Sequence, residues 1–113
     1  MGFNRLIGRK MVVRYTLLKD LDVRLIERNG RTLLSVRGSI VESFKVFDSV
    51  AVTMEDRTIS LTVYASLKFW CREGSPEFSV TEELHLPSGT YTIEYAGVGE
   101  HVPLGEARSP EHE

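Results

Sequence analysis

Two histidines with nearby glutamates are the first residues in this 113-residue sequence that could bind a metal. Imidazole and carboxylate groups are competent zinc ligands, and the four candidates are His85, His101, Glu83 and Glu100. Glu83 and His85 share one face of a strand-like segment, whereas Glu100 and His101 lie in a glycine-rich, loop-like segment. Because this spacing does not bring a ligand set together, we predict no metal site and no cofactor. A small metal-dependent enzyme is therefore the least favoured function.

The sequence also lacks the motifs of nucleophilic and phosphate-binding catalysis. It contains no glycine-rich phosphate loop, no nucleophile elbow and no paired cysteines. Cys71 is the only cysteine, and it follows Trp70 without an adjacent histidine or lysine that would activate the thiol. We predict that the protein is not an enzyme, and that Cys71 is a buried apolar residue with no disulfide.

Arginines gather around one predicted hairpin, and they are the strongest candidates for binding. Asn29-Gly30 separates two apolar runs, and this dipeptide favours a two-residue type I′ turn because both residues tolerate a positive φ. Asn29 and Gly30 are therefore structural residues. Counting outward from the turn fixes which residues share a face. The face opposite the core carries the candidate binding residues Arg24, Ile26, Arg28, Arg31, Leu33 and Arg37.

Guanidinium groups on this face could bind carboxylates or phosphates beside an apolar anchor. In the predicted register Arg28 lies directly opposite Arg31, and like charges at opposed positions are destabilising. An anion or an acidic partner would relieve that cost. The alternative is a solvated outer face, on which the arginine stems cover Ile26 and Leu33.

Charge is divided unevenly along the chain. Residues 1–45 carry ten Lys and Arg against four Asp and Glu, and residues 46–113 carry four against twelve, which gives +6 and −8 within the net −2. This division predicts an acidic partner, contact between copies, or neutralisation inside the fold. If the basic hairpin of one copy meets the region of Glu82, Glu83 and Glu94 of another, the assembly is a ring or an open chain. An edge strand that pairs with its own mate would instead give a two-fold dimer.

Strand-like alternation dominates the elements that position these residues. From Thr58 to Trp70 every second residue is apolar, which indicates a strand with one buried face. Residues 50–54 alternate in the same way, and Glu55-Asp56 is the predicted turn between the two strands. Asp48 falls on the apolar side of its strand, so we expect a bulge near Asp48-Ser49.

The remaining strands are predicted at residues 10–18, 22–28, 31–37, 78–86 and 91–95. In the hairpin we expect a buried set of Val23, Leu25, Leu34 and Val36. About seven strands and no convincing helix predict an all-β fold, a single antiparallel β-sandwich, with a small β-barrel as the alternative. Residues 1–103 are expected to form one domain, and residues 104–113 a mobile C-terminal tail.

The segment from Leu86 to Ile93 resembles the entry to the penultimate strands of fibronectin-III-like and immunoglobulin-like domains. In those families a tyrosine after a glycine-containing corner hydrogen-bonds to the preceding main chain. The resemblance implies this structural role for Tyr91. The sequence departs from the immunoglobulin pattern because it has no cysteine pair, and Ile93 stands where the second cysteine would lie.

These observations favour a non-catalytic module that binds a protein partner or itself, with a preference for an acidic surface. A nucleic-acid-binding barrel is the alternative, but the basic hairpin lacks the aromatic residues that stack on bases. Near the N-terminus, Arg5, Arg9 and Arg14 interrupt any continuous apolar segment. We therefore predict neither a signal peptide nor a membrane span there. The sequence does not determine the cellular compartment, and we take the cytoplasm as the default expectation.

Overall fold

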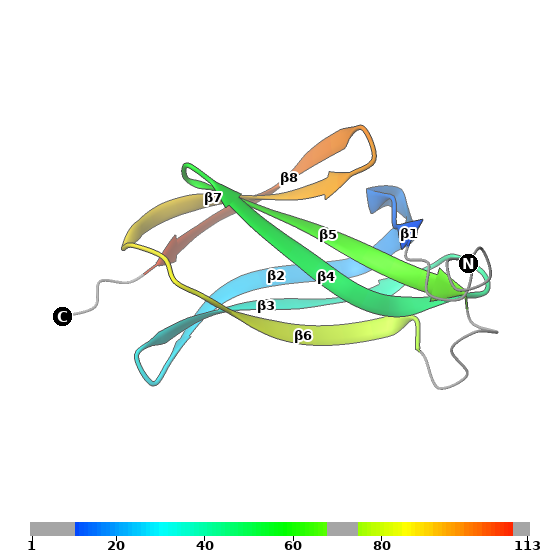
Figure 1. Cartoon of the computed structure of the whole chain (residues 1–113), viewed down its shortest axis with the longest axis horizontal. Coiled ribbons are helices and arrows are strands. Elements are labelled where there is room, and N and C mark those ends of the chain that lie inside the picture. Colours follow the sequence, from blue (N-terminus) through cyan, green and yellow to red (C-terminus); the bar gives the residue numbers. More distant parts are fainter. Residues whose placement is uncertain (1–10, 68–74, 110–113) are drawn as a thin grey trace, which may run out of the picture.

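A computed structural model describes residues 11–67 and 75–109, and these form two β-sheets packed face to face (Figure 1). The elements in chain order are β1 (Met11–Val12), a 3-10 turn η1 (Tyr15–Leu17), β2 (Leu18–Arg28), β3 (Arg31–Ile40), β4 (Lys45–Glu55), β5 (Thr58–Leu67), β6 (Glu77–Leu84), β7 (Gly89–Gly97) and β8 (Glu100–Ser109).

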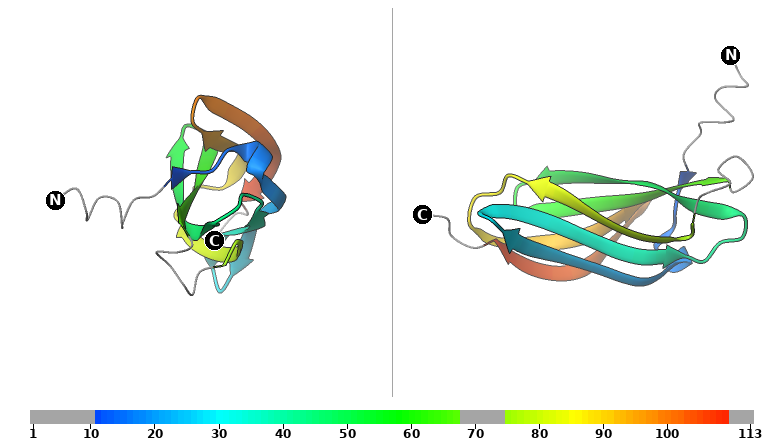
Figure 2. Two further views of the ribbon diagram at one scale, coloured as in Figure 1. Left: turned by 90° about the vertical axis from the view of Figure 1, so that its right-hand side faces the viewer. Right: turned by 90° about the horizontal axis from the view of Figure 1, so that it is seen from below.

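The smaller sheet has three strands in the order β2-β3-β6, and the larger sheet contains β4, β5, β7 and β8 with the short β1. All described strand pairs are antiparallel except β5 with β7, which are parallel. No strand of the smaller sheet pairs with a strand of the larger sheet among the described residues, and Figure 2 shows the molecule along and across its long axis. The predicted all-β sandwich is therefore confirmed, and the alternative of a small barrel is not. The prediction of a purely antiparallel sandwich is wrong, because β5 and β7 pair in parallel.

The core lies between the sheets and is centred on β5. Four alternate residues of this strand, Ile59, Leu61, Val63 and Ala65, have no exposed surface. Burial of a large aliphatic side chain contributes about 1.5–3 kcal/mol, so this one strand face is a major source of stability. At the β4–β6 side, Phe47 and Phe78 stack with their ring centroids 4.7 Å apart and join the two sheets.

β5 changes its neighbour along its length, and Tyr95 fills the junction. β7 pairs with β5 as far as Leu61, and β1 pairs with it from Tyr64 onward. Between these points the buried Tyr95 hydroxyl accepts a hydrogen bond from the Val63 N–H at 3.2 Å and donates one to the Val13 carbonyl. Burial raises the pKa of Tyr95, so the hydroxyl stays protonated and can donate.

The predicted hairpin register is confirmed from Asp22 opposite Arg37 to Arg28 opposite Arg31. Of the predicted core set, Leu34 and Val36 are buried, but Val23 and Leu25 are only half-buried. The reason is that β2 is an edge strand, and a cavity of about 270 Å³ between β2 and β8 reaches Val23.

The predicted bulge is also confirmed, because the β4–β5 register shifts between Phe47 and Ser49. Asp48 holds this bulge by accepting hydrogen bonds from the hydroxyls of Ser49, at 2.8 Å, and Ser66, at 3.2 Å. The turn that follows β4 lies one residue later than predicted. Glu55 pairs with Thr58, so Asp56 and Arg57 are its two central residues.

Two predictions near the chain ends are wrong. Residues 11–18 do not form one strand, because β1 has two residues and Tyr15–Leu17 forms a 3-10 turn. Residues 104–109 are not a tail, since they form the second half of β8 and pair with β7. A bulge at Leu104 shifts the inward positions of β8 from even to odd residues, which hides the alternation. Residues 110–113, and the predictions for Cys71 and Trp70, lie outside the described residues.

Candidate binding surface

The outer face of the smaller sheet brings all six predicted binding residues together. Arg24, Ile26 and Arg28 alternate along β2, and the register places Ser35, Leu33 and Arg31 opposite them on β3. Arg37 continues this face opposite Asp22. We call the six predicted residues the basic face: Arg24, Ile26, Arg28, Arg31, Leu33 and Arg37.

Three of these arginines have a carboxylate partner within the same sheet. Asp22 accepts hydrogen bonds from Arg24 Nε at 3.0 Å and from Arg37 Nη2 at 3.1 Å. These two bonds hold the pKa of the Asp22 carboxyl below its usual value. Arg31 Nη1 lies 3.6 Å from Glu83 Oε1 on β6. Of these three contacts, only that of Arg31 with Glu83 joins the basic residues 1–45 to the acidic residues 46–113, because Asp22 belongs to the basic part itself.

The arginine side chains remain largely in solvent despite these contacts. Their exposed fractions are 69% for Arg24, 68% for Arg31 and 59% for Arg37. Exposed ion pairs of this kind contribute about 0–1 kcal/mol to stability. A guanidinium group has five N–H donors, so one carboxylate contact leaves others available on each of these exposed side chains.

The tip of the hairpin concentrates positive charge. Arg28 lies opposite Arg31, and Arg28 has no ion pair with any described residue. Asn29 and Gly30 have φ of 55° and 74°, as a type I′ turn requires, so their predicted structural role is confirmed. The half-buried Ile26 and Leu33 lie opposite each other next to this tip.

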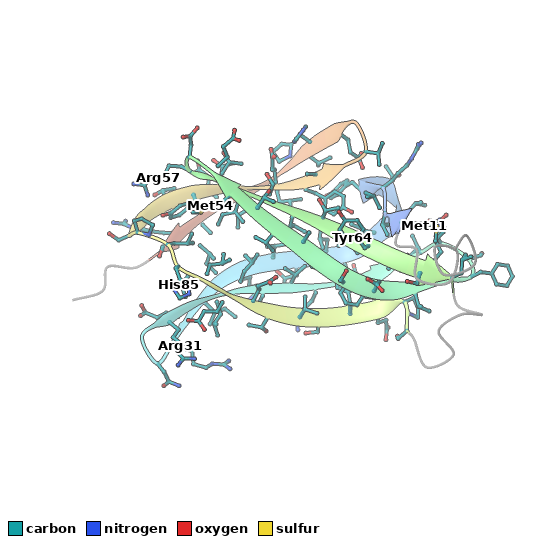
Figure 3. The ribbon with its side chains drawn as sticks, in the orientation of Figure 1. Met11, Arg31, Met54, Arg57, Tyr64 and His85 are labelled. Carbon is teal, nitrogen blue, oxygen red and sulfur yellow. The ribbon has the colours of Figure 1, made fainter. Side chains whose placement is uncertain are left out.

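A shallow cavity of about 250 Å³ adjoins the tip on its β6 side. Arg31, Glu83 and His85 contribute to its lining together with the backbone at Gly30. Figure 3 shows Arg31 and His85 at this end of the molecule. The cavity extends the basic face beyond the two hairpin strands, and the sequence did not predict it because β6 is distant in the chain.

The four residues considered as zinc ligands do not come together: Glu83 and His85 line the cavity beside the hairpin tip, whereas Glu100 and His101 lie on β8. Glu83 contacts Arg31, and Glu100 accepts the Tyr15 backbone N–H at 2.9 Å. His101 contacts Glu94, with 3.0 Å between Nδ1 and Oε2. Within residues 11–67 and 75–109, no three His, Cys, Asp or Glu residues are grouped as metal ligands.

The outer face of the larger sheet holds a second polar cluster, which sequence reasoning missed. Ser60 Oγ donates to Glu94 Oε2 at 2.7 Å, and the contact with His101 is to the same oxygen. The bond from Ser60, followed by that from His101, lowers the pKa of Glu94. Since both partners bind the carboxylate, the histidine does not link it to the serine as a nucleophilic triad requires. Parallel pairing of β5 with β7 creates this cluster.

The predicted corner at Tyr91 is confirmed. Its ring is buried, and its hydroxyl donates to the Pro87 carbonyl at 2.6 Å. Arg57 from the β4–β5 turn lies over the ring, 5.2 Å from its centroid, and donates to the Ser88 carbonyl at 3.3 Å. Tyr91 therefore fixes the β6–β7 connection at the end of the sandwich where the hairpin tip lies (Figure 1).

Comparisons with protein-family models, with curated proteins and with solved structures give no match. None of the helical structure in the described part of the chain has the length and hydrophobicity needed to cross a lipid bilayer.

Proposed function

We propose that this protein is a non-catalytic binding module, and that its basic face binds an acidic surface on a protein partner. The observation that carries the proposal is the pairing of Arg28 with Arg31 across the hairpin tip, beside Ile26 and Leu33. A partner carboxylate placed between the two guanidinium groups would relieve their repulsion. The apolar pair would supply the desolvated contact that interface centres contain.

The ion pairs on this face support binding rather than oppose it. Asp22 orients Arg24 and Arg37 while both remain exposed, so less conformational freedom is lost when a partner binds. Arginine presents several donors in a planar fork, and one carboxylate partner leaves others available. The basic face is thus partly organised before it meets a partner.

A protein partner fits this face better than a nucleic acid does. The basic face carries no aromatic side chain, and the nearby Phe78 of β6 points into the core. Binding of single strands relies on aromatic side chains that stack on bases. Binding of phosphate alone would be weak and strongly dependent on salt.

The test is charge reversal at the hairpin tip, with binding measured for the full chain. We expect Arg28→Glu with Arg31→Glu to abolish binding of an oligo-glutamate peptide and capture of acidic proteins from a lysate. The matched control is Arg14→Glu with Arg108→Glu, which reverses two exposed arginines outside the basic face. A single-stranded oligonucleotide serves as the second probe. Equal binding by the tip variant and the wild type would overturn the proposal.

A further inference from the structure

Three of the four long edge strands in the sandwich carry features that hinder pairing with another chain. β2 contains six charged residues and a register shift after Lys19. β6 follows Pro76 and carries Glu77, Glu82 and Glu83. β8 contains Pro103 and the bulge at Leu104. Charges, prolines and bulges are the usual devices that protect sheet edges.

β4 lacks these devices over its second half. The segment from Ser49 to Met54 contains no charged residue, no proline and no glycine. Before it, the bulge at Asp48 interrupts the strand, and the Phe47 N–H bonds to the Ser75 carbonyl at 2.8 Å. Beyond the bulge, no described residue from outside the sheet makes a backbone hydrogen bond to β4. As far as residues 11–67 and 75–109 are concerned, this segment of regular edge is therefore open.

The turn after β4 determines which backbone groups face outward. Because Asp56 and Arg57 form a two-residue connection, the closing pair of Glu55 with Thr58 is hydrogen-bonded. Hydrogen-bonded and non-hydrogen-bonded pairs alternate in an antiparallel ladder. The N–H and C=O groups of Val50, Val52 and Met54 consequently point away from β5.

The same three residues leave apolar surface at the edge. Their side chains lie on the core side of the sheet, opposite Val63, Leu61 and Ile59 of β5. Val50 and Val52 are half-buried, and Met54 is 45% exposed. Figure 3 shows Met54 near the end of β4 that leads into the turn. This edge thus combines unpaired backbone groups with a partly exposed apolar row.

We propose that two copies of the chain pair through β4, antiparallel and related by a two-fold axis at Val52. Val52 then faces Val52 of the second copy, and Val50 faces Met54 of the second copy. Each of these pairs exchanges two backbone hydrogen bonds through the outward groups. The two larger sheets join into one continuous sheet across the axis.

The sequence of the segment is complementary to itself in this register. The apolar row of one copy continues into the apolar row of the other, and the exposed Met54 is covered by Val50 of its mate. On the outer side Ala51 faces Thr53, and Ser49 faces Glu55, so no like charges are opposed. A charged partner strand would gain no ion pair from Ser49–Met54, which favours a second copy as the occupant.

The contact is one strand wide, which is smaller than the interfaces of permanent dimers. The dimer is therefore expected to depend on protein concentration and to be insensitive to salt. It does not rest on the proposed function, because the basic face lies on the other sheet.

Sedimentation equilibrium of the full chain, from micromolar to near-millimolar protein at low and high salt, tests the proposal. We expect the mass to rise from one chain to two at both salt concentrations. Met54→Lys should raise the dissociation constant of the dimer roughly tenfold or more, because the lysine would face Val50 of the mate. The matched control Val98→Lys alters an exposed valine in the β7–β8 turn and should leave the dissociation constant unchanged.

Thr53→Lys provides a second variant on the solvent side of β4, and thermal unfolding verifies that each variant is folded. A wild-type mass of one chain at every concentration overturns the proposal, even if β4 binds a strand from another protein. Equal dissociation constants for the wild type, Met54→Lys and Thr53→Lys also overturn it. Reversal of Arg28 and Arg31 should leave the dimer intact, which separates this contact from the proposed function.

Discussion

At the scale of single residues, two tyrosine hydroxyls fix parts of the chain that strand pairing does not reach. Tyr95 bonds to the backbone of Val13 and Val63 where β5 changes its neighbour. Tyr91 bonds to Pro87 at the corner before β7. In each case a side chain bonds to backbone groups outside the strand ladders. At the buried Tyr95 site this satisfies groups that would otherwise lack a partner.

Tyr91→Phe tests the corner bond. We expect it to lower the free energy of unfolding by roughly 0.5–1.5 kcal/mol, the usual net value of one hydrogen bond, with no change in fold. Denaturant unfolding monitored by circular dichroism measures this. Tyr15→Phe is the control, because no hydrogen bond from the Tyr15 hydroxyl is seen among the described residues. An unchanged midpoint for Tyr91→Phe would refute the role of the bond.

Glu94 should contribute a pH-dependent part of the stability. Its folded pKa lies below the usual 4.5, chiefly because Ser60 donates a hydrogen bond to it. A lowered carboxyl pKa stabilises the fold above the unfolded value, and this contribution is lost as the pH falls through the folded value. Glu94→Gln should therefore unfold at a lower temperature than the wild type at pH 7.

The difference between Glu94→Gln and the wild type should shrink progressively as the pH falls below 4.5. Calorimetric scans across this range measure it. Glu82→Gln is the control, since Glu82 is exposed and makes no ion pair with the described residues. A difference for Glu94→Gln that is constant with pH would contradict the assignment.

At the scale of elements, a side chain on a central strand is more completely buried than the equivalent side chain on an edge strand. Leu34 on the central β3 has no exposed surface, whereas Leu25 opposite it on the edge strand β2 is half-buried. The two residues share a rung of one ladder and a side-chain type. Their difference in burial therefore isolates the effect of strand position.

Leu34→Asp should unfold the domain. It removes about 1.5–3 kcal/mol of apolar burial and places a carboxylate between Leu25 and Glu82, neither of which can pair with it. The total stability of a typical domain is only about 5–15 kcal/mol. Leu25→Asp should be markedly milder, because water reaches its position. Urea unfolding of both variants tests this order, and equal losses of stability would contradict it.

At the scale of the whole molecule, local pairings were predictable from the sequence and distant ones were not. Asn29-Gly30 determines a hairpin because its turn geometry fixes the register on both sides. No local signal indicates that residues 58–61 pair in parallel with residues 92–95. The basic face was predictable because it lies mainly on one hairpin, but its contact with Glu83 and the Ser60–Glu94–His101 cluster depend on distant strands.

The acidic region predicted to meet the hairpin of another copy does not exist as one surface. Glu83 already contacts Arg31, and Glu94 lies on the other sheet with Ser60 and His101. A charge sum over a stretch of sequence mixes residues from both sheets and both faces, so it cannot distinguish an interface from internal neutralisation. The odd or even position of a residue within its strand is more informative, because it indicates on which face of the sheet the charge lies.

The change of neighbour along β5 also sets an order of events during synthesis on the ribosome. β4 can pair with β5 as soon as Leu67 has emerged, and β1 can cover only the second half of the opposite edge. The first half waits for residues 92–95. At about 5–20 residues per second, that wait lasts on the order of seconds. During this interval the central strand of the nascent protein has an open edge, so the last third of the chain is what protects it from premature association.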